Sequence, residues 1–83
     1  MTAWEWPRFL PVGESAALVQ FGAAIDPGIN ARVHRLAALL EQAGWEGFGE
    51  AVPAYTSLLV HYDPLLWAYS DVITRIESCL PRL

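Results

Sequence analysis

The sequence predicts an α+β fold, a two-layer sandwich in which two helices cover one face of a four-stranded antiparallel sheet. Two amphipathic helical segments and four short strand-like segments support this prediction, and they follow one another in the order ββαββα. A helix with one apolar stripe must bury that stripe against another layer. Four strands make a sheet wide enough to cover both helices. We therefore expect one core and one domain over residues 1–83.

The first two strands are predicted at residues 8–12 and 16–21. Apolar residues alternate along the second segment, as they do in a strand with one buried face. Gly13 lies between the two segments and can adopt the positive φ of a tight turn. Pro11 has no N–H to donate, so the first strand is expected at an edge of the sheet.

The first helix is predicted to begin at Asp26-Pro27 and to end before Gly44. An aspartate side chain accepts hydrogen bonds from the first N–H groups of a helix, and proline suits the first helical position. Glycine is favoured where the chain leaves a helix in a left-handed conformation. Apolar residues recur at i, i+4, i+7 and i+11 between these ends and form one stripe. They are Ile29, Val33, Leu36 and Leu40.

The second half repeats this pattern. Strands are predicted at residues 48–52 and 57–62, joined by a connection over 53–56. A second helix is predicted to be capped by Ser70 and closed by Pro81. Its apolar positions are Val72, Ile73, Ile76 and Leu80.

The composition excludes several classes of partner. Five basic residues, all arginine, stand against nine acidic residues, and the net charge of −4 lacks the basic surface that nucleic acid requires. The single Cys79 allows no intrachain disulfide, and two isolated histidines give no spacing for a zinc site. No apolar run approaches the ~20 residues of a membrane span, and residues 1–11 lack the features of a signal peptide. We expect a cytoplasmic protein with no metal and no membrane partner.

The sequence contains no complete catalytic constellation. Ser57 and His61 share one face of a predicted strand, but four residues of strand place them roughly 13 Å apart, too far for a dyad. The acidic residues are scattered, and the glycines do not form a phosphate loop with a following Lys and Ser/Thr. We expect no catalytic residue and no cofactor in this chain.

The tryptophans indicate a contact surface. All of them lie outside the predicted helices and strands, where a small core has difficulty burying them. Tryptophan is enriched at the centres of protein interfaces. Packing beneath loops is an equally good interpretation. The residues are Trp4, Trp6, Trp45 and Trp67.

Four motifs resemble, in the same order, those of a known family. They lie at residues 8–14, 17–22, 25–30 and 52–64, and the most specific is P-x-Y-x-S-L-L-V-x-Y-D-P, which begins at Pro53. The resemblance extends over about residues 8–80. They resemble the N-terminal domain of the carboxyltransferase-domain family, subdomains C and D, which includes the B subunit of 5-oxoprolinase, allophanate hydrolase subunit 1 and the sporulation kinase inhibitor KipI.

The resemblance implies that residues 1–83 form the N-terminal domain of a subunit, and that a cyclophilin-like domain, absent from this chain, normally follows. The subunit would pair with a second subunit in an ATP-dependent complex that hydrolyses 5-oxoproline or allophanate. This domain would supply structure and contacts, and ATP would belong to the full complex. The alternative is a KipI-like regulator that binds a sensor histidine kinase. A third hypothesis is a free-standing homo-oligomeric binding module.

Five residues of the matched motifs are candidates for contact with a partner. Polar groups at two turns of the predicted sheet would converge at one end of it. Simple turn formation is the alternative explanation for these residues. The candidates are Arg8, Glu14, Pro53, Tyr55 and Ser57.

Overall fold

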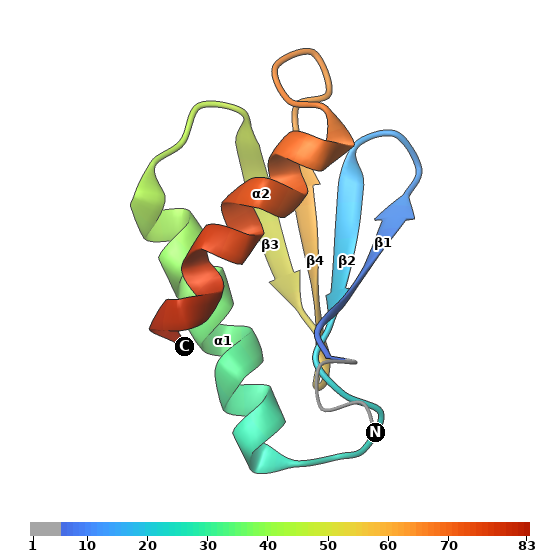
Figure 1. The fold of residues 1–83 in the computed structure, drawn as a ribbon, viewed down its shortest axis with the longest axis vertical. Coiled ribbons are helices and arrows are strands. Elements are labelled where there is room, and N and C mark those ends of the chain that lie inside the picture. Colours follow the sequence, from blue (N-terminus) through green and yellow to red (C-terminus); the bar gives the residue numbers. More distant parts are fainter. Residues whose placement is uncertain (1–5) are drawn as a thin grey trace.

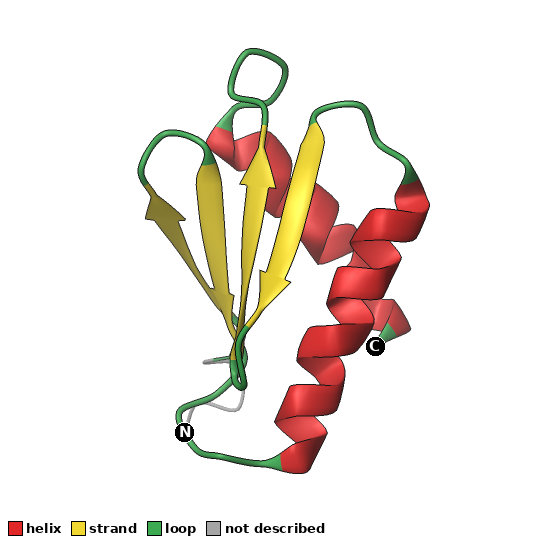
Figure 2. Ribbon diagram, turned by 180° about the vertical axis from the view of Figure 1, so that it is seen from behind, coloured by secondary structure: helices red, strands yellow, loops and turns green. Residues whose placement is uncertain are grey.

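The computed structural model describes residues 6–83 and shows the predicted two-layer arrangement. Helix α2 crosses in front of the sheet in Figure 1 and behind it in Figure 2, and α1 lies beside β3 in both views. The sheet is antiparallel, in the order β1-β2-β4-β3. The elements are β1 (Arg8–Val12), β2 (Ala16–Gln20), α1 (Pro27–Ala43), β3 (Phe48–Pro53), β4 (Ser57–Tyr62), α2 (Tyr69–Cys79) and a short 3-10 turn, η2 (Leu80–Arg82).

Helix α1 begins and ends as predicted. The Asp26 carboxylate accepts a hydrogen bond from the Gly28 N–H at 2.7 Å, and Pro27 occupies the first turn. Gly44 ends the helix with φ 68°, the left-handed conformation expected of it. Of the predicted apolar stripe, Ile29 is half-buried and the other three residues are buried in the core.

Helix α2 is capped two residues earlier than the predicted Ser70 cap. Ala68 is the residue before the helix, and its N–H donates to the Asp71 carboxylate at 2.8 Å. The acidic side chain in the first turn thus supplies the N3 half of a capping box, and it also suits the positive end of the helix dipole. The helix ends at Cys79, after which Pro81 lies in η2.

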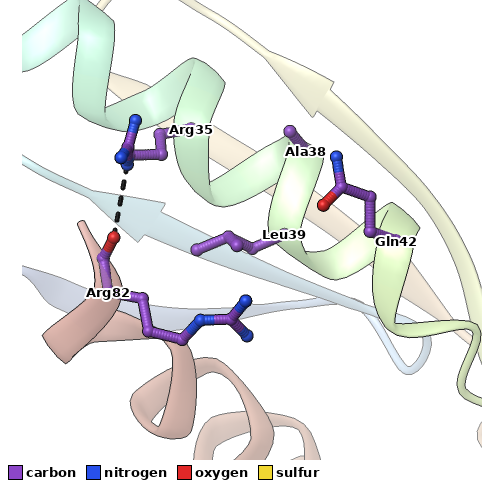
Figure 3. Close-up of a pocket in the computed structure, with 5 residues that line it drawn as sticks. All are labelled: Arg35, Ala38, Leu39, Gln42 and Arg82. Carbon is purple, nitrogen blue, oxygen red and sulfur yellow. Dashed lines mark hydrogen bonds between the residues drawn. The ribbon is translucent and has the colours of Figure 1, made fainter.

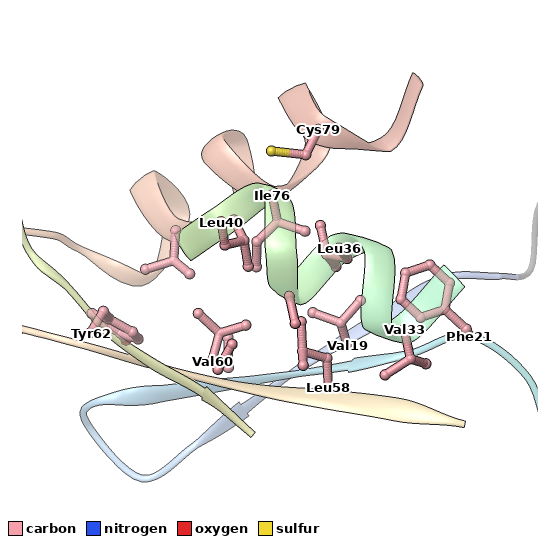
Figure 4. Close-up of a cluster of buried hydrophobic side chains, with 14 of the residues drawn as sticks. Val19, Phe21, Val33, Leu36, Leu40, Leu58, Val60, Tyr62, Ile76 and Cys79 are labelled. Atoms are coloured by element: carbon pink, nitrogen blue, oxygen red, sulfur yellow. The ribbon is translucent and has the colours of Figure 1, made fainter. Parts of the chain in front are cut away.

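The core lies between the helices and one face of the sheet, as Figure 4 shows. The register aligns Ala17, Val60 and Ala51 across β2, β4 and β3, and all three are buried. Both edge strands contain a proline, Pro11 in β1 and Pro53 in β3, and each proline removes one donor from its strand. Pro11 therefore lies at a sheet edge as predicted.

The other face of the sheet carries an apolar row. Leu10, Leu18, Leu59 and Val52 are in register across β1, β2, β4 and β3. Leu10 and Val52 are exposed, whereas Leu18 and Leu59 are half-buried. No part of residues 6–83 forms a helix on this face (Figure 2). Neither helix of the described chain has the length and hydropathy needed to cross a membrane.

Trp67 is buried, and the expectation of exposed tryptophan is wrong at this position. Its side chain is 6% exposed, stacks on Tyr62 with centroids 6.5 Å apart, and meets the edge of Trp45 at 6.2 Å. The Arg75 guanidinium lies 4.5 Å from the Trp67 ring centroid. Packing beneath a loop, the other interpretation of the tryptophans, therefore holds here.

Tyr69, at the start of α2, has a pKa above its usual value. Burial of the phenol is the main cause, and the nearby Tyr62 also raises the pKa.

The remaining tryptophans are less enclosed. Trp45 and Trp6 are half-buried. The Arg8 guanidinium lies 4.4 Å from the Trp6 ring centroid. Trp4 lies outside the described residues.

Candidate partner-contact site

The turn between β3 and β4, residues 54–56, is held by hydrogen bonds from two other elements. The Phe21 N–H at the end of β2 donates to the Thr56 carbonyl at 2.8 Å. The side-chain amide of Asn30, in the first turns of α1, donates to the Tyr55 carbonyl at 3.0 Å. We call residues 54–56 the Tyr55 turn. Its backbone is thus fixed relative to both the sheet and α1.

The Tyr55 turn presents its aromatic side chain to solvent. Tyr55 is 42% exposed although its carbonyl is hydrogen-bonded. Ile25, in the link between β2 and α1, is 76% exposed. Figure 1 shows this link and the Tyr55 turn at the same end of the sheet. One end of the molecule therefore combines a fixed backbone with exposed apolar and aromatic side chains, which is typical of a contact surface.

The structure brings four of the five predicted contact residues to this end. Arg8 pairs with Gln20 on β2, and Gln20 pairs with Ser57 on β4, so the three lie in one row across the sheet. Pro53 is the last residue of β3 and leads into the Tyr55 turn. Arg8 and Pro53 are exposed, and Ser57 is half-buried.

Glu14 lies at the opposite end, so the predicted convergence of both turns is wrong. Strands β2 and β4 are antiparallel neighbours, and Ala16 pairs with His61 while Gln20 pairs with Ser57. The turn that contains Glu14 precedes Ala16 and therefore lies beyond His61, four residues of strand away from the Tyr55 turn. The β1–β2 turn and the β3–β4 turn lie at opposite ends of the sheet.

Ser57 and His61 share the outer face of β4 but stand four residues apart, as predicted. Residues 6–83 contain no group of three or more His, Cys, Asp or Glu side chains that could hold a metal ion. This end of the domain presents a phenol, a guanidinium and apolar side chains at its surface.

Two exposed leucines were not predicted. Leu65 is 91% exposed and Leu66 is 52% exposed, in the link between β4 and α2. The Asp63 carboxylate accepts from the Leu65 N–H at 2.9 Å, and the Asp63 carbonyl accepts from the Leu66 N–H at 3.0 Å. The signal was present in the sequence, because Asp63-Pro64 is a turn-forming pair that is followed by two apolar residues.

A groove on the helical layer was also not predicted. It has a volume of about 380 Å³ and lies between α1 and η2 (Figure 3). The residues that line it come from segments far apart in the sequence. A hydrogen bond from the Arg35 Nε to the Arg82 carbonyl, at 3.2 Å, connects the two sides of the groove. The lining residues are Arg35, Ala38, Leu39, Gln42 and Arg82.

Comparison with known proteins gives a consistent result. The family described as carboxyltransferase domain, subdomain C and D, matches residues 7–83. The chain is similar to the B subunit of 5-oxoprolinase from Bacillus subtilis (strain 168), with 44% identity over 52 residues. That match covers 63% of this chain and 22% of the relative. The matched segment therefore spans about a fifth of this relative's length.

Two solved structures share the fold. A conserved uncharacterized protein from Pyrococcus horikoshii has a TM-score of 0.82 and 44% identity, over 90% of this chain and 35% of that chain. The N-terminal domain of the histidine kinase inhibitor KipI from Bacillus subtilis has a TM-score of 0.71 and 30% identity. That match covers 90% of this chain and 84% of the KipI domain.

Proposed function

Since the chain belongs to the family described as carboxyltransferase domain, subdomain C and D, we propose that it is a non-catalytic assembly domain of a protein like the B subunit of 5-oxoprolinase or like allophanate hydrolase subunit 1. In this proposal it works within an ATP-dependent amide-hydrolysing complex, and the reactive groups come from another domain or subunit. The similarity to the 5-oxoprolinase relative supports the first of the two assignments.

The observation that carries the proposal is the exposed Tyr55 on a fixed turn. A side chain whose backbone is already held in place loses less conformational freedom on binding than one on a mobile loop. Tyrosine also combines a large apolar ring with a hydroxyl group, and it is enriched among residues that dominate binding energy. In this proposal, Tyr55 anchors a second subunit.

A KipI-like regulator is the second candidate function. The similarity that favours it is the match to the N-terminal domain of KipI, which covers 84% of that domain. In this case the partner of the Tyr55 turn would be a sensor histidine kinase. Both candidates use the same surface and differ in the protein that it binds.

Replacing Tyr55 by alanine is expected to weaken binding of the partner without unfolding the domain. The Tyr55 side chain is exposed, and only its carbonyl is used by Asn30. Loss of an interface anchor costs about 2 kcal/mol, or roughly thirtyfold in affinity. Tagged wild-type and variant chains are compared for recovery of the second hydrolase subunit, and circular dichroism checks the fold.

Leu65→Ala is the matched control for this variant. It removes an even more exposed side chain from the link between β4 and α2. Recovery of the partner is expected to stay at the wild-type level. Undiminished recovery with Tyr55→Ala, or an equal loss with Leu65→Ala, would exclude the Tyr55 turn as the contact.

A further inference from the structure

The groove between α1 and η2 contains two arginines, and the side chain of Arg35 is bonded to the backbone of Arg82. Figure 3 shows Leu39 between Arg35 and Arg82, with Gln42 further along α1. Arg35 donates through its Nε to the Arg82 carbonyl at 3.2 Å, which restrains the plane of its guanidinium. The two terminal nitrogens of Arg35 remain available as a pair of parallel donors, the arrangement that matches a carboxylate.

Neither guanidinium is neutralised within the described chain. Arg35 and Arg82 form no ion pair with a carboxylate of residues 6–83. No acidic residue lies three or four positions from Arg35 along α1, where helix neighbours would pair with it. The protein as a whole carries a net charge of −4, whereas the lining of this groove contains two arginines and no acidic residue.

One apolar side chain, Leu39, lies among the polar residues that line the groove. Leu39 is half-buried, while Arg35, Gln42 and Arg82 around it are exposed. A ligand that fills this groove would combine a negative charge with an apolar group beside it. A free inorganic anion would use the arginines and leave Leu39 uncovered.

We infer that this groove is a docking site for an acidic segment of a partner protein. A carboxylate of the segment binds between Arg35 and Arg82, and a neighbouring apolar side chain packs on Leu39. Charge complementarity carries the assignment, because the groove is positive and carboxylate-free within an acidic domain. The inference depends on the proposed function only in that the domain binds protein, and the surface is distinct from the Tyr55 turn.

The probe is an acetylated and amidated hexapeptide, Glu-Leu-Glu-Glu-Leu-Glu, titrated into the ¹⁵N-labelled chain. Resonances of Leu39 and Gln42 are expected to shift. Arg35→Gln and Arg82→Gln should each weaken binding about threefold, the size expected for an exposed ion pair. Added salt should weaken binding further, because it screens exposed charges.

Arg32→Gln is the matched control, since it changes the net charge by the same amount on the same helix. Its guanidinium lies 5.4 Å from the Phe21 ring centroid and does not line the groove. Binding by this variant is expected to equal that of the wild type. An equal loss with Arg32→Gln would mean general charge attraction and would overturn the inference.

Three other results would also overturn it. They are an absence of shifts in the groove, equal binding of a peptide with glutamine in place of glutamate, and equal binding of free glutarate, which would assign the groove to small carboxylates. The Tyr55→Ala variant should bind the peptide normally. The peptide could fail to bind while Tyr55→Ala still reduces recovery of the partner. That result would overturn this inference and leave the proposed function standing.

Discussion

Replacement of Leu36 by alanine is expected to cost the domain about 3 kcal/mol of its free energy of unfolding. Leu36 lies on α1, is fully buried, and belongs to the cluster that joins the sheet to both helices (Figure 4). A domain of this size has a stability of roughly 5 kcal/mol. The variant would therefore keep less than half of its stability. Urea denaturation followed by circular dichroism measures the change.

A leucine outside the core gives the comparison for Leu36→Ala. Leu65→Ala removes the same atoms from a side chain that is almost fully exposed. Its free energy of unfolding is expected to change by less than about 0.5 kcal/mol. Similar losses for the two variants would show that Leu36 is not at the centre of the core.

Replacement of Gly47 by alanine is expected to cost about 2 to 4 kcal/mol, from backbone strain and overpacking together. Gly47 has φ +102°, a conformation that residues with a Cβ rarely adopt. A Cβ at this position would lie 2.6 Å from the Trp67 Nε1. The Trp67 ring cannot move away easily, because it is buried between Tyr62 and Trp45.

Gly44→Ala separates the two contributions. Gly44 also has a positive φ, +68°, but no atom lies within 4 Å of the place that a Cβ would occupy. This variant is expected to lose only about 1 kcal/mol, the backbone cost alone. The same denaturation experiment, with near-ultraviolet circular dichroism of the tryptophans, measures both. A Gly47→Ala domain as stable as Gly44→Ala would contradict the close packing of Trp67.

Local signals predicted most of the fold. The bounds of α1 followed from Asp26, Pro27 and Gly44, because capping depends on residues adjacent in the sequence. The strands followed from alternation over a few residues. The start of α2 was missed by two residues, because Asp71 inside the helix caps it and not Ser70. Ser70 and Asp71 are both residue types that favour a helix start, and the Asp71 side chain makes the hydrogen bond to the residue before the helix.

Features that depend on distant contacts were not predicted. Trp67 is buried because Gly47, twenty positions earlier, leaves room for its ring. The separation of Glu14 from the Tyr55 turn follows from the pairing of β2 with β4, which no short motif reveals. The groove requires Arg35 and Arg82, whose sequence separation is 47.

The candidate contact site was predicted only in part, because some of its residues are brought together by contacts between distant segments. Arg8, Pro53, Tyr55 and Ser57 belong to neighbouring ends of β1, β3 and β4, and the sheet brings them together. Ile25 was not among the candidates, although it is exposed at the same end. The exposure of Ile25 depends on how the link between β2 and α1 crosses the end of the sheet. The role of the four candidates in binding a partner stays a prediction.

The measurement that tests the account most directly is affinity purification with the complete protein as bait in a lysate of its source cells. The proposed function predicts recovery of a second, carboxyltransferase-like subunit, and ATP-dependent hydrolysis of 5-oxoproline or allophanate by the recovered complex. Recovery of a histidine kinase in its place would favour the KipI-like regulator. Turnover of either substrate by the purified 83-residue chain alone would contradict the claim that this domain only assembles the enzyme.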